Sequence, residues 1–395
     1  MRILFLQFTN PAGYPPLLHS SRILAERGCD ILFLGTGAYG TESLQIPPHP
    51  RIRERRVGPY ATGWRQKTLY GRFCLRALLC SSRWKPHWIY ASDPLSCPAA
   101  LLLARLFSIP VVYHEHDSPM SHGCRGVVLR ARHMLARRAR LCVLPNQARV
   151  EQFRVATGRT GACNAVWNCP SRTEALRAAL GHGEFILHYH GNLGPDLVPM
   201  TLLDALAKTP GTRLDVVGYA TKGQEHYPAA LLAEAKRRCL LNRVRVRPAM
   251  PRAEMLEETR RASLGIALTP AQSANPNFET MVGASNKPFE YLACGVPALV
   301  SDRPDWRTAF QAPGYGLSCD PRDADSIARV LRWATEHRDA AQSMGERGRQ
   351  KILSDWNYER QFEPVARQLI CPGRGSPDDG LGSRGASRGD ELGVA

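Results

Sequence analysis

Side chains that could do chemistry gather in ASNKPFEYLACGVPALVSD, residues 284–302. The pattern predicts a short helix that begins near Ser285 or Asn286, with Pro288 in its first turn, followed by a buried strand. The unpaired N–H groups at a helix start suit an anionic phosphate. Glu290, one turn later, can accept a hydrogen bond from a ribose hydroxyl. The stretch therefore indicates a nucleotide site, with an ordinary capped helix before a core strand as the alternative.

A second polar group, His114, Glu115, His116 and Asp117, follows IPVVY, which is typical of a buried strand. Ligands of open parallel sheets collect beyond the carboxyl ends of the strands, which is where this group falls. Three explanations are open. The group could form a metal site together with His122, a structural cluster bonded to nearby backbone, or part of an active site.

Two glycine-containing loops lie where a ligand would be expected. Gly13 follows the first predicted strand in TNPAGYPP, and Gly191 and Asn192 follow another predicted strand in HGNLG. Glycine lets the backbone pass close to a ligand such as a diphosphate. An isolated glycine in a turn is the alternative for Gly13, because the motif of a dinucleotide site is missing there.

Repeated strand and helix patterns must position these residues. ILFLQF, SSRILAERG and DILFLG predict a strand, helix, strand unit, and FILHYHG opens a second such series. We expect a domain over 1–174 and another over 175–354. A helix is expected over 355–370. The Gly-, Ser- and Asp-rich residues 371–395 are expected to be disordered.

The run NKPFEYLACGVPALVS resembles the nucleotide-sugar signature of retaining GT-B glycosyltransferases, family 4 (group 1) in particular. VVYHEHDSP is similar to a strand end of the same family, with His116 in the place of its histidine and Asp117 in the place of its glutamate. The resemblance implies the GT-B fold: two Rossmann-like β/α/β domains facing a central cleft. It also implies that the helix over 355–370 crosses back to the first domain.

The resemblance assigns roles to individual residues. It implies that Glu290 binds the donor ribose and that His116 orients the donor sugar. The residues expected around the departing phosphate are Gly191, Asn192, Ser285 and Asn286, the last two through their amides, and the loop of Gly13 is expected to lie against donor and acceptor. The implied reaction uses a nucleotide-diphosphate sugar as co-substrate and needs no other cofactor and no metal.

Two departures from the family pattern concern the charge and the sugar. Members follow the GNLG loop with an Arg and a Lys that neutralise the diphosphate, whereas this chain continues PDLVPMTLL. Lys222 and Lys287 are the cations expected to replace them. The family's first signature glutamate, which contacts the sugar, is Val282 here, with Glu279 three residues away.

Composition excludes several classes of protein. The 395 residues are 44% hydrophobic and 22% charged, which are globular values. The twelve cysteines show no C-x-x-C pair, so neither a zinc site nor a disulfide framework is indicated. No apolar run reaches the roughly 18 residues of a membrane span, and MRILFLQFTN reads as a strand rather than a signal peptide. We expect a cytoplasmic protein, or one peripheral on the inner face of the cell membrane.

The net charge of +17 is concentrated in the first half. Residues 1–172 hold 24 Lys and Arg against 8 Asp and Glu, and residues 51–85 hold ten against Glu54 alone. A basic amphipathic helix is predicted there by an apolar stripe of Phe73, Leu75, Ala77, Leu78 and Leu79, and RGVVLRARHMLARRAR predicts another. An anionic or lipid-linked acceptor, or an anionic membrane surface, is the expected partner, and nucleic acid is not. A solvated cationic face is the alternative.

We therefore expect a glycosyltransferase of the hexosyltransferase type, acting with retention on a precursor of a polysaccharide or glycoconjugate. A sugar-nucleotide epimerase of the same fold is one alternative. The missing cations and Val282 motivate another, a non-catalytic partner subunit.

Overall fold

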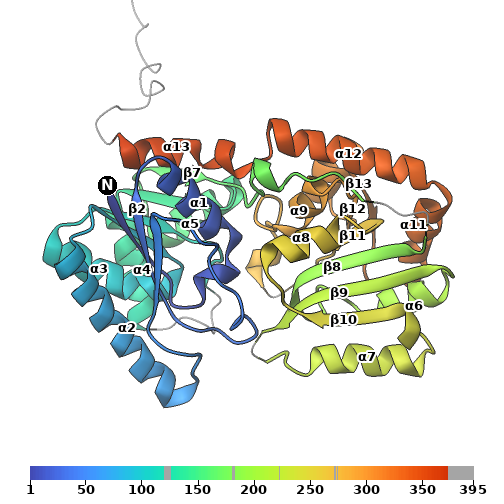
Figure 1. The fold of residues 1–395 in the computed structure, drawn as a ribbon, viewed down its shortest axis with the longest axis horizontal. Coiled ribbons are helices and arrows are strands. Elements are labelled where there is room, and N and C mark those ends of the chain that lie inside the picture. The colour runs from blue at the N-terminus through green and yellow to red at the C-terminus, as the bar shows by residue number, and fades with distance from the viewer. Residues whose placement is uncertain (120–125, 180–182, 222, 271–272, 274, 372–395) are drawn as a thin grey trace, which may run out of the picture.

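Two parallel sheets, each with helices on both faces, organise the protein (Figure 1). The computed structural model describes residues 1–119, 126–179, 183–221, 223–270, 273 and 275–371. One sheet has seven strands and the other six, and they are formed by separate parts of the chain. The prediction of a two-domain α/β fold with parallel sheets is confirmed.

The N-terminal domain carries the sheet of order β3-β2-β1-β4-β5-β6-β7, in which all neighbours are parallel. Its strands are β1 (Arg2–Leu6), β2 (Asp30–Gly35), β3 (Ile52–Arg56), β4 (Trp88–Ser92), β5 (Val111–His114), β6 (Leu141–Leu144) and β7 (Cys163–Ala165). Its helices are the 3₁₀ turn η1 (Pro11–Gly13), α1 (Pro15–Glu26), α2 (Gly63–Trp84), α3 (Cys97–Phe107), α4 (Val127–Arg138) and α5 (Gln147–Thr157).

The C-terminal domain carries the sheet of order β10-β9-β8-β11-β12-β13, again parallel. Its strands are β8 (Phe185–Leu193), β9 (Thr212–Ala220), β10 (Val244–Pro248), β11 (Leu264–Ala267), β12 (Ala298–Ser301) and β13 (Gly316–Cys319). Its helices are α6 (Thr201–Ala207), α7 (Tyr227–Arg237), α8 (Arg252–Thr259), α9 (Lys287–Ala293), α10 (Pro304–Trp306), α11 (Ala324–Glu336) and α12 (Arg338–Ser354).

The last described helix, α13 (Tyr358–Ile370), belongs to the N-terminal core although it follows the C-terminal domain (Figure 1). Its apolar face, including Phe362 and Leu369, is buried in one cluster with Phe5 and Leu17. Because parallel strands are buried on both faces, this side of the first sheet needs a cover, which α1 and α13 supply. The chain therefore crosses between the domains twice.

Near the second crossing the two connecting segments touch. The Trp167 and Trp356 rings lie 5.8 Å apart, and the Tyr358 amide donates to the Pro170 carbonyl at 2.9 Å. The 3₁₀ turn η3 (Arg172–Glu174) is held here as well, since the Ser171 hydroxyl hydrogen-bonds the Glu359 carboxylate. The crossings thus form one junction.

A buried arginine joins the two domains a second time. Arg149 on α5 donates to the His116 carbonyl at 2.6 Å and to the Asn277 carbonyl, in the other domain, at 3.0 Å. Asn146, the cap of α5, donates to the carbonyls of Thr280 and Val282. The loop before α9 is therefore fastened to the first domain through its backbone.

Helix α2 differs from the expected stripe at one residue. Phe73 and Ala77 are fully buried and Leu78 and Leu79 are half-buried, but Leu75 is 56% exposed. Residues three or four apart share a helix face, whereas Leu75 lies two residues from the buried Phe73 and two from the buried Ala77. Among the described helices, none is both long and apolar enough to cross a membrane. Residues 372–395, most of the segment expected to be disordered, lie outside the described part.

Candidate active site

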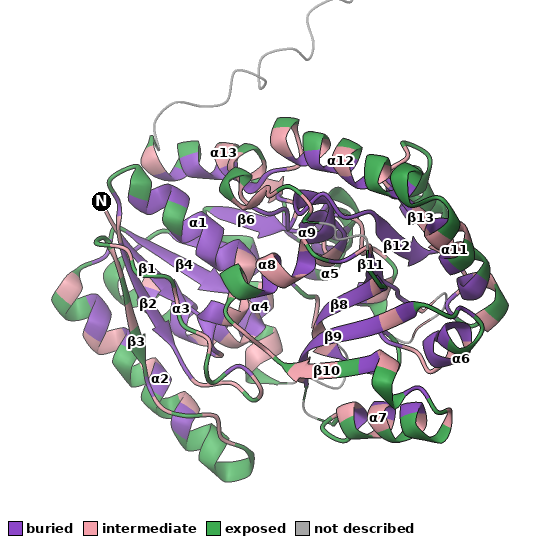
Figure 2. Ribbon diagram, turned by 45° about the vertical axis from the view of Figure 1, so that its right-hand side comes forward, coloured by how far each residue is buried: buried purple, intermediate pink, exposed green. Residues whose placement is uncertain are grey.

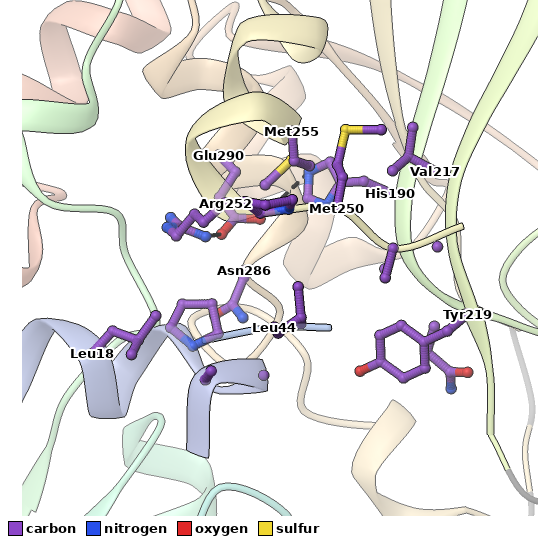
Figure 3. A pocket seen from close by; sticks show the side chains of 18 of the residues that line it. Leu18, Leu44, His190, Val217, Tyr219, Met250, Arg252, Met255, Asn286 and Glu290 are labelled. Carbon is purple, nitrogen blue, oxygen red and sulfur yellow. Dashed lines mark hydrogen bonds and ion pairs between the residues drawn. The ribbon is translucent and has the colours of Figure 1, made fainter. Parts of the chain in front are cut away.

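A cavity of about 510 Å³ lies between the domains. Leu18 and Leu44 reach it from the N-terminal domain, and Arg252, Asn286 and Glu290 from the C-terminal domain (Figure 3). Of the residues singled out in the sequence, those that line it are Gly13, Asp117, Gly191, Asn192, Ser285, Asn286, Lys287 and Glu290. The fold therefore brings together eight of the ten expected site residues, the other two being His116 and Lys222.

The end of β8 forms one wall. Gly191 has a φ of +109°, and an added Cβ would lie 3.2 Å from Lys287 Cε, so a side chain here would press on the lysine. Gly191 and Asn192 were expected in a loop, but β8 runs on to Leu193 because β9 pairs with it up to Ala220. The strand end, not a free loop, thus presents the backbone beside Lys287.

The start of α9 forms the adjacent wall, but it offers fewer donors than expected. The Ser285 amide donates to the Met281 carbonyl at 2.8 Å, so it is already used, and the expectation that it binds phosphate is wrong in this structure. Ser285 contributes only as a lining residue. Asn286 precedes α9, and its buried Oδ1 has no hydrogen-bond partner among the described residues. This oxygen is an acceptor, so it suits a hydroxyl of a ligand and not a phosphate.

Lys287 lies between the two walls. Its ammonium is 5.4 Å from the centre of the Tyr189 ring, a cation–π contact. Burial lowers the pKa of Lys287, while Glu290 and Asp117 oppose that shift. A cation held against Gly191 at the head of α9 is suitably placed for a bound diphosphate.

Glu290 is 3% exposed and forms an ion pair with Arg252, the first residue of α8 (Figure 3). Arg252 also holds Glu174, with Nε–Oε1 and Nη2–Oε2 distances of 2.5 and 2.9 Å. Glu174 in turn lies 3.3 Å from His19 on α1. The result is a buried row of charges that passes from the C-terminal domain through η3 to the N-terminal domain.

Glu174 and Arg252 each favour the charged form of the other. Burial alone would raise the pKa of Glu174, but Arg252, His19 and hydrogen bonds lower it to about 2. Burial opposes the charge of Arg252, yet Glu174 and Glu290 raise its pKa. Arg252 is therefore a permanent cation on the cavity wall, where the loop after Gly194 supplies none. The sequence signal that could have indicated Arg252 is its position directly after the proline-containing turn of residues 248–251, and the sequence analysis did not use it.

The opposite wall carries Asp117, whose carboxylate is 76% exposed and lies 3.2 Å from Arg149. His116 beside it is 6% exposed and is not among the lining residues. Its ring lies 3.9 Å from that of His114, centre to centre, as the alternation of a strand predicts. Glu115 points elsewhere and is paired with the buried Arg132.

His116 is neutral at neutral pH. Burial lowers its pKa to about 4, with Arg149 acting in the same direction and Asp117 against it. Neither ring nitrogen has a hydrogen-bond partner among the described residues. A buried imidazole without partners is costly, and a ligand hydroxyl would satisfy it.

Asp93, after β4, is a further residue that the sequence did not single out. Its φ of +62° is rare outside glycine, and its Oδ1 accepts from the His116 amide at 3.0 Å. Burial raises the pKa of Asp93 to about 7, although the His116 amide and Gln7 lower it. Asp93 therefore fixes the backbone that carries His116.

Asp93→Asn should be more stable than the wild type near pH 8, by a few degrees in melting temperature, and this advantage should vanish near pH 4. The folded pKa of about 7 exceeds the ordinary value of 3.8, so the contribution of this carboxyl is complete below the lower value and is lost as the pH rises through the upper one. His116 titrates in both proteins and cancels. Melting curves with the same pH dependence would contradict the assignment.

The remaining expected residues stand apart from the cavity or outside the described part. Lys222 and His122 lie outside the described residues. Glu279 is exposed and does not line the cavity, so it does not substitute there for the glutamate replaced by Val282. Among the described residues, no group of three or more His, Cys, Asp or Glu is arranged to hold a metal ion.

Comparisons with known proteins agree with this geometry. The family model described as "Glycosyl transferase 4-like domain" matches residues 17–169, and "Glycosyl transferase-like" matches residues 200–367. A glycogen synthase of Mycobacterium tuberculosis is 23% identical over 421 residues, which cover 95% of this chain and 96% of the relative.

Two solved structures show the same fold. Sucrose-phosphate synthase from Thermosynechococcus elongatus has a TM-score of 0.73 at 16% identity, covering 94% of this chain and 100% of its own. HepE of Anabaena, solved with UDP and glucose, has a TM-score of 0.69 at 18% identity, covering 94% and 99%.

Proposed function

We propose, from the premise that this chain is built of two glycosyltransferase-type domains in the GT-B arrangement, that it transfers a sugar from a nucleotide-diphosphate sugar to an acceptor with retention of configuration. The family 4 type and a hexosyl donor are parts of this proposal. HepE is described in complex with UDP-glucose, which supports a nucleotide sugar as the donor.

One observation carries the proposal. A single cavity is lined by Glu290, Lys287 and Gly191 from one domain and by Gly13 and Asp117 from the other. A donor held by the first three residues, which belong to the C-terminal domain, would place its sugar toward the N-terminal domain. The acceptor would then enter from the N-terminal side, and closing the cleft would exclude water from the reacting centre.

Each group has a role in this proposal. Glu290 accepts from the ribose hydroxyls. Lys287 and the backbone of Gly191 and Asn192 hold the diphosphate. Arg252 lies on the same wall but is paired with Glu174 and Glu290, so Lys287 and the backbone donors compensate the leaving diphosphate in this proposal, which requires no metal.

The N-terminal domain acts on the sugar. The neutral His116 ring would hydrogen-bond a sugar hydroxyl and orient the anomeric carbon, while the Asp117 carboxylate would stabilise positive charge that develops on the sugar. For the acceptor we propose an anionic or lipid-linked precursor of a polysaccharide or glycoconjugate, since the N-terminal half holds 24 Lys and Arg against 8 Asp and Glu.

Product analysis tests the function. A thermal-shift screen over UDP-, GDP- and ADP-sugars should find a stabilising donor, and incubation with that donor should release the nucleoside diphosphate and a free or transferred sugar. An isomerised nucleotide sugar formed without acceptor would instead identify an epimerase. Absence of binding to every donor would favour a non-catalytic subunit.

Lys287→Met should weaken donor binding about tenfold to a hundredfold, because it removes a charge-assisted contact to the diphosphate. Lys208→Met is the matched control. Lys208 is exposed in the turn between α6 and β9, and among the described residues it pairs only with Asp325. Calorimetric titration of the donor identified above would measure both. Equal affinity of the Lys287 variant and the control would remove Lys287 from the site.

A further inference from the structure

A second cavity, of about 270 Å³, lies in the N-terminal domain between the edge strand β3 and the C-terminal half of α2. It shares no lining residue with the cleft. Figure 2 shows β3 and α2 on the outer side of this domain, away from the strands of the other sheet. The second cavity is therefore separate from the proposed donor site.

Four arginines surround this cavity: Arg53 and Arg55 from β3, and Arg76 and Arg83 from α2. Alternation along a strand puts the first two on one face, and a spacing of seven puts the other two on one side of the helix. Fold geometry thus directs all four toward one hollow.

Among the described residues, no carboxylate forms an ion pair with these four arginines. The nearby ion pairs are those of Arg56 with Glu54 and of Arg51 with Asp30. Within the described part of the chain, the guanidinium groups of the four make one weak polar contact, from Arg55 to the Cys80 sulfur at 4.0 Å. Like charges around one hollow repel each other, and an anion bound there would convert that repulsion into attraction.

The floor of the cavity is apolar. Leu32 and Cys80 are buried there, and Leu79 and Trp84 are partly buried beside them. Guanidinium groups bind phosphate oxygens through paired N–H donors, and they do so more strongly beside an apolar surface than in open water. The four arginines are themselves exposed, so the arrangement is an open hollow with guanidinium groups around an apolar floor.

We propose that this four-arginine pocket binds a phosphate ester, as a site distinct from the donor cleft. A phosphomonoester or diphosphate would lie among Arg53, Arg55, Arg76 and Arg83, with the group it esterifies against Trp84. The phosphate could be carried by a lipid headgroup or by a soluble molecule, and both have the same chemistry. The pocket's occupation does not depend on the transfer reaction.

The test is anion binding by the full chain. Titration with inorganic pyrophosphate is compared for the wild type, for Arg55→Gln/Arg76→Gln and for the charge-matched control Arg138→Gln/Arg140→Gln, whose exposed arginines lie at the end of α4. The pocket variant should lose about tenfold or more in affinity for one of the binding sites, and the control less than about twofold. The cleft is unchanged in all three proteins, so its own binding of pyrophosphate cancels.

Flotation with phosphatidylcholine vesicles distinguishes the sources. If phosphatidic acid recruits the wild type more than phosphatidylserine at equal surface charge, and the pocket variant loses this preference, the source is a lipid headgroup. If pyrophosphate binding depends on the pocket while flotation does not, the source is soluble. Either result supports the pocket.

Equal losses in the pocket variant and the control would show that only the overall basic charge matters, and would overturn the proposal. The variant should fold, because removing two like charges lowers repulsion, and its melting temperature should not fall. Loss of pocket binding with donor turnover intact would separate this inference from the proposed function.

Discussion

Glu290→Gln is expected to lower kcat/KM for the donor about tenfold to a hundredfold. The substitution keeps the shape of the side chain but replaces the charge-assisted bonds to the ribose hydroxyls by neutral ones, at a cost of about 1 kcal/mol or more for each bond. It also removes one of the two carboxylates that hold Arg252 on the cavity wall. Steady-state kinetics with the donor found by thermal shift would measure the loss.

Glu174→Gln is the matched variant for this experiment. It removes the other carboxylate of Arg252 with the same change in shape and charge, and Glu174 does not line the cavity. We expect it to lower kcat/KM less than about threefold and to act mainly on melting temperature. If the two variants lose activity equally, Glu290 acts through Arg252 and not through the ribose.

His116→Ala is expected to lower kcat about a hundredfold while KM for the donor stays within about threefold. A hydrogen bond that orients the sugar in the transition state acts on kcat, whereas the nucleotide is held by the other domain. Because burial lowers the pKa of His116 to about 4, this group should add no inflection to the wild-type kcat profile between about pH 6 and 8. His116→Asn, which keeps a hydrogen-bonding group, should recover part of the loss.

A structural role for His116 would give a different result. The imidazole packs on His114 and Tyr14, so a variant that only loosened this packing would lower melting temperature without separating kcat from KM. An effect on KM with kcat intact would also exclude the proposed role. Measuring the melting temperature beside the kinetics keeps the two explanations apart.

Local patterns were sufficient for the features that depend on neighbouring residues. Pro288 marks the first turn of α9, which begins at Lys287, and the polar residues after IPVVY follow the end of β5 at His114. Apolar runs bounded by turns indicated the parallel strands, because such strands are buried on both faces.

Features that depend on distant parts of the chain could not be found in this way. Arg252 acquires its meaning from Glu174 and Glu290, which lie 78 and 38 positions away. Gly283 marks a turn before α9 but does not indicate that this turn would direct the Ser285 amide to the Met281 carbonyl. Arg149 looks like any helix arginine until the loop at Asn277 is brought against it. Such partners follow from the packing of the two domains.

The double crossing of the chain restricts how the cleft can open. The segments around Trp167 and Trp356 pass side by side, and the last described helix, α13, packs on the domain where the chain begins. Two connecting segments that lie side by side form one hinge. Such a hinge permits rotation of the domains about a single axis and resists twisting or sliding. Truncation before Tyr358 would remove one of the two connections between the domains and would also expose Phe5 and Leu17. A shortened protein would therefore lose both the restriction on its domain motion and its solubility.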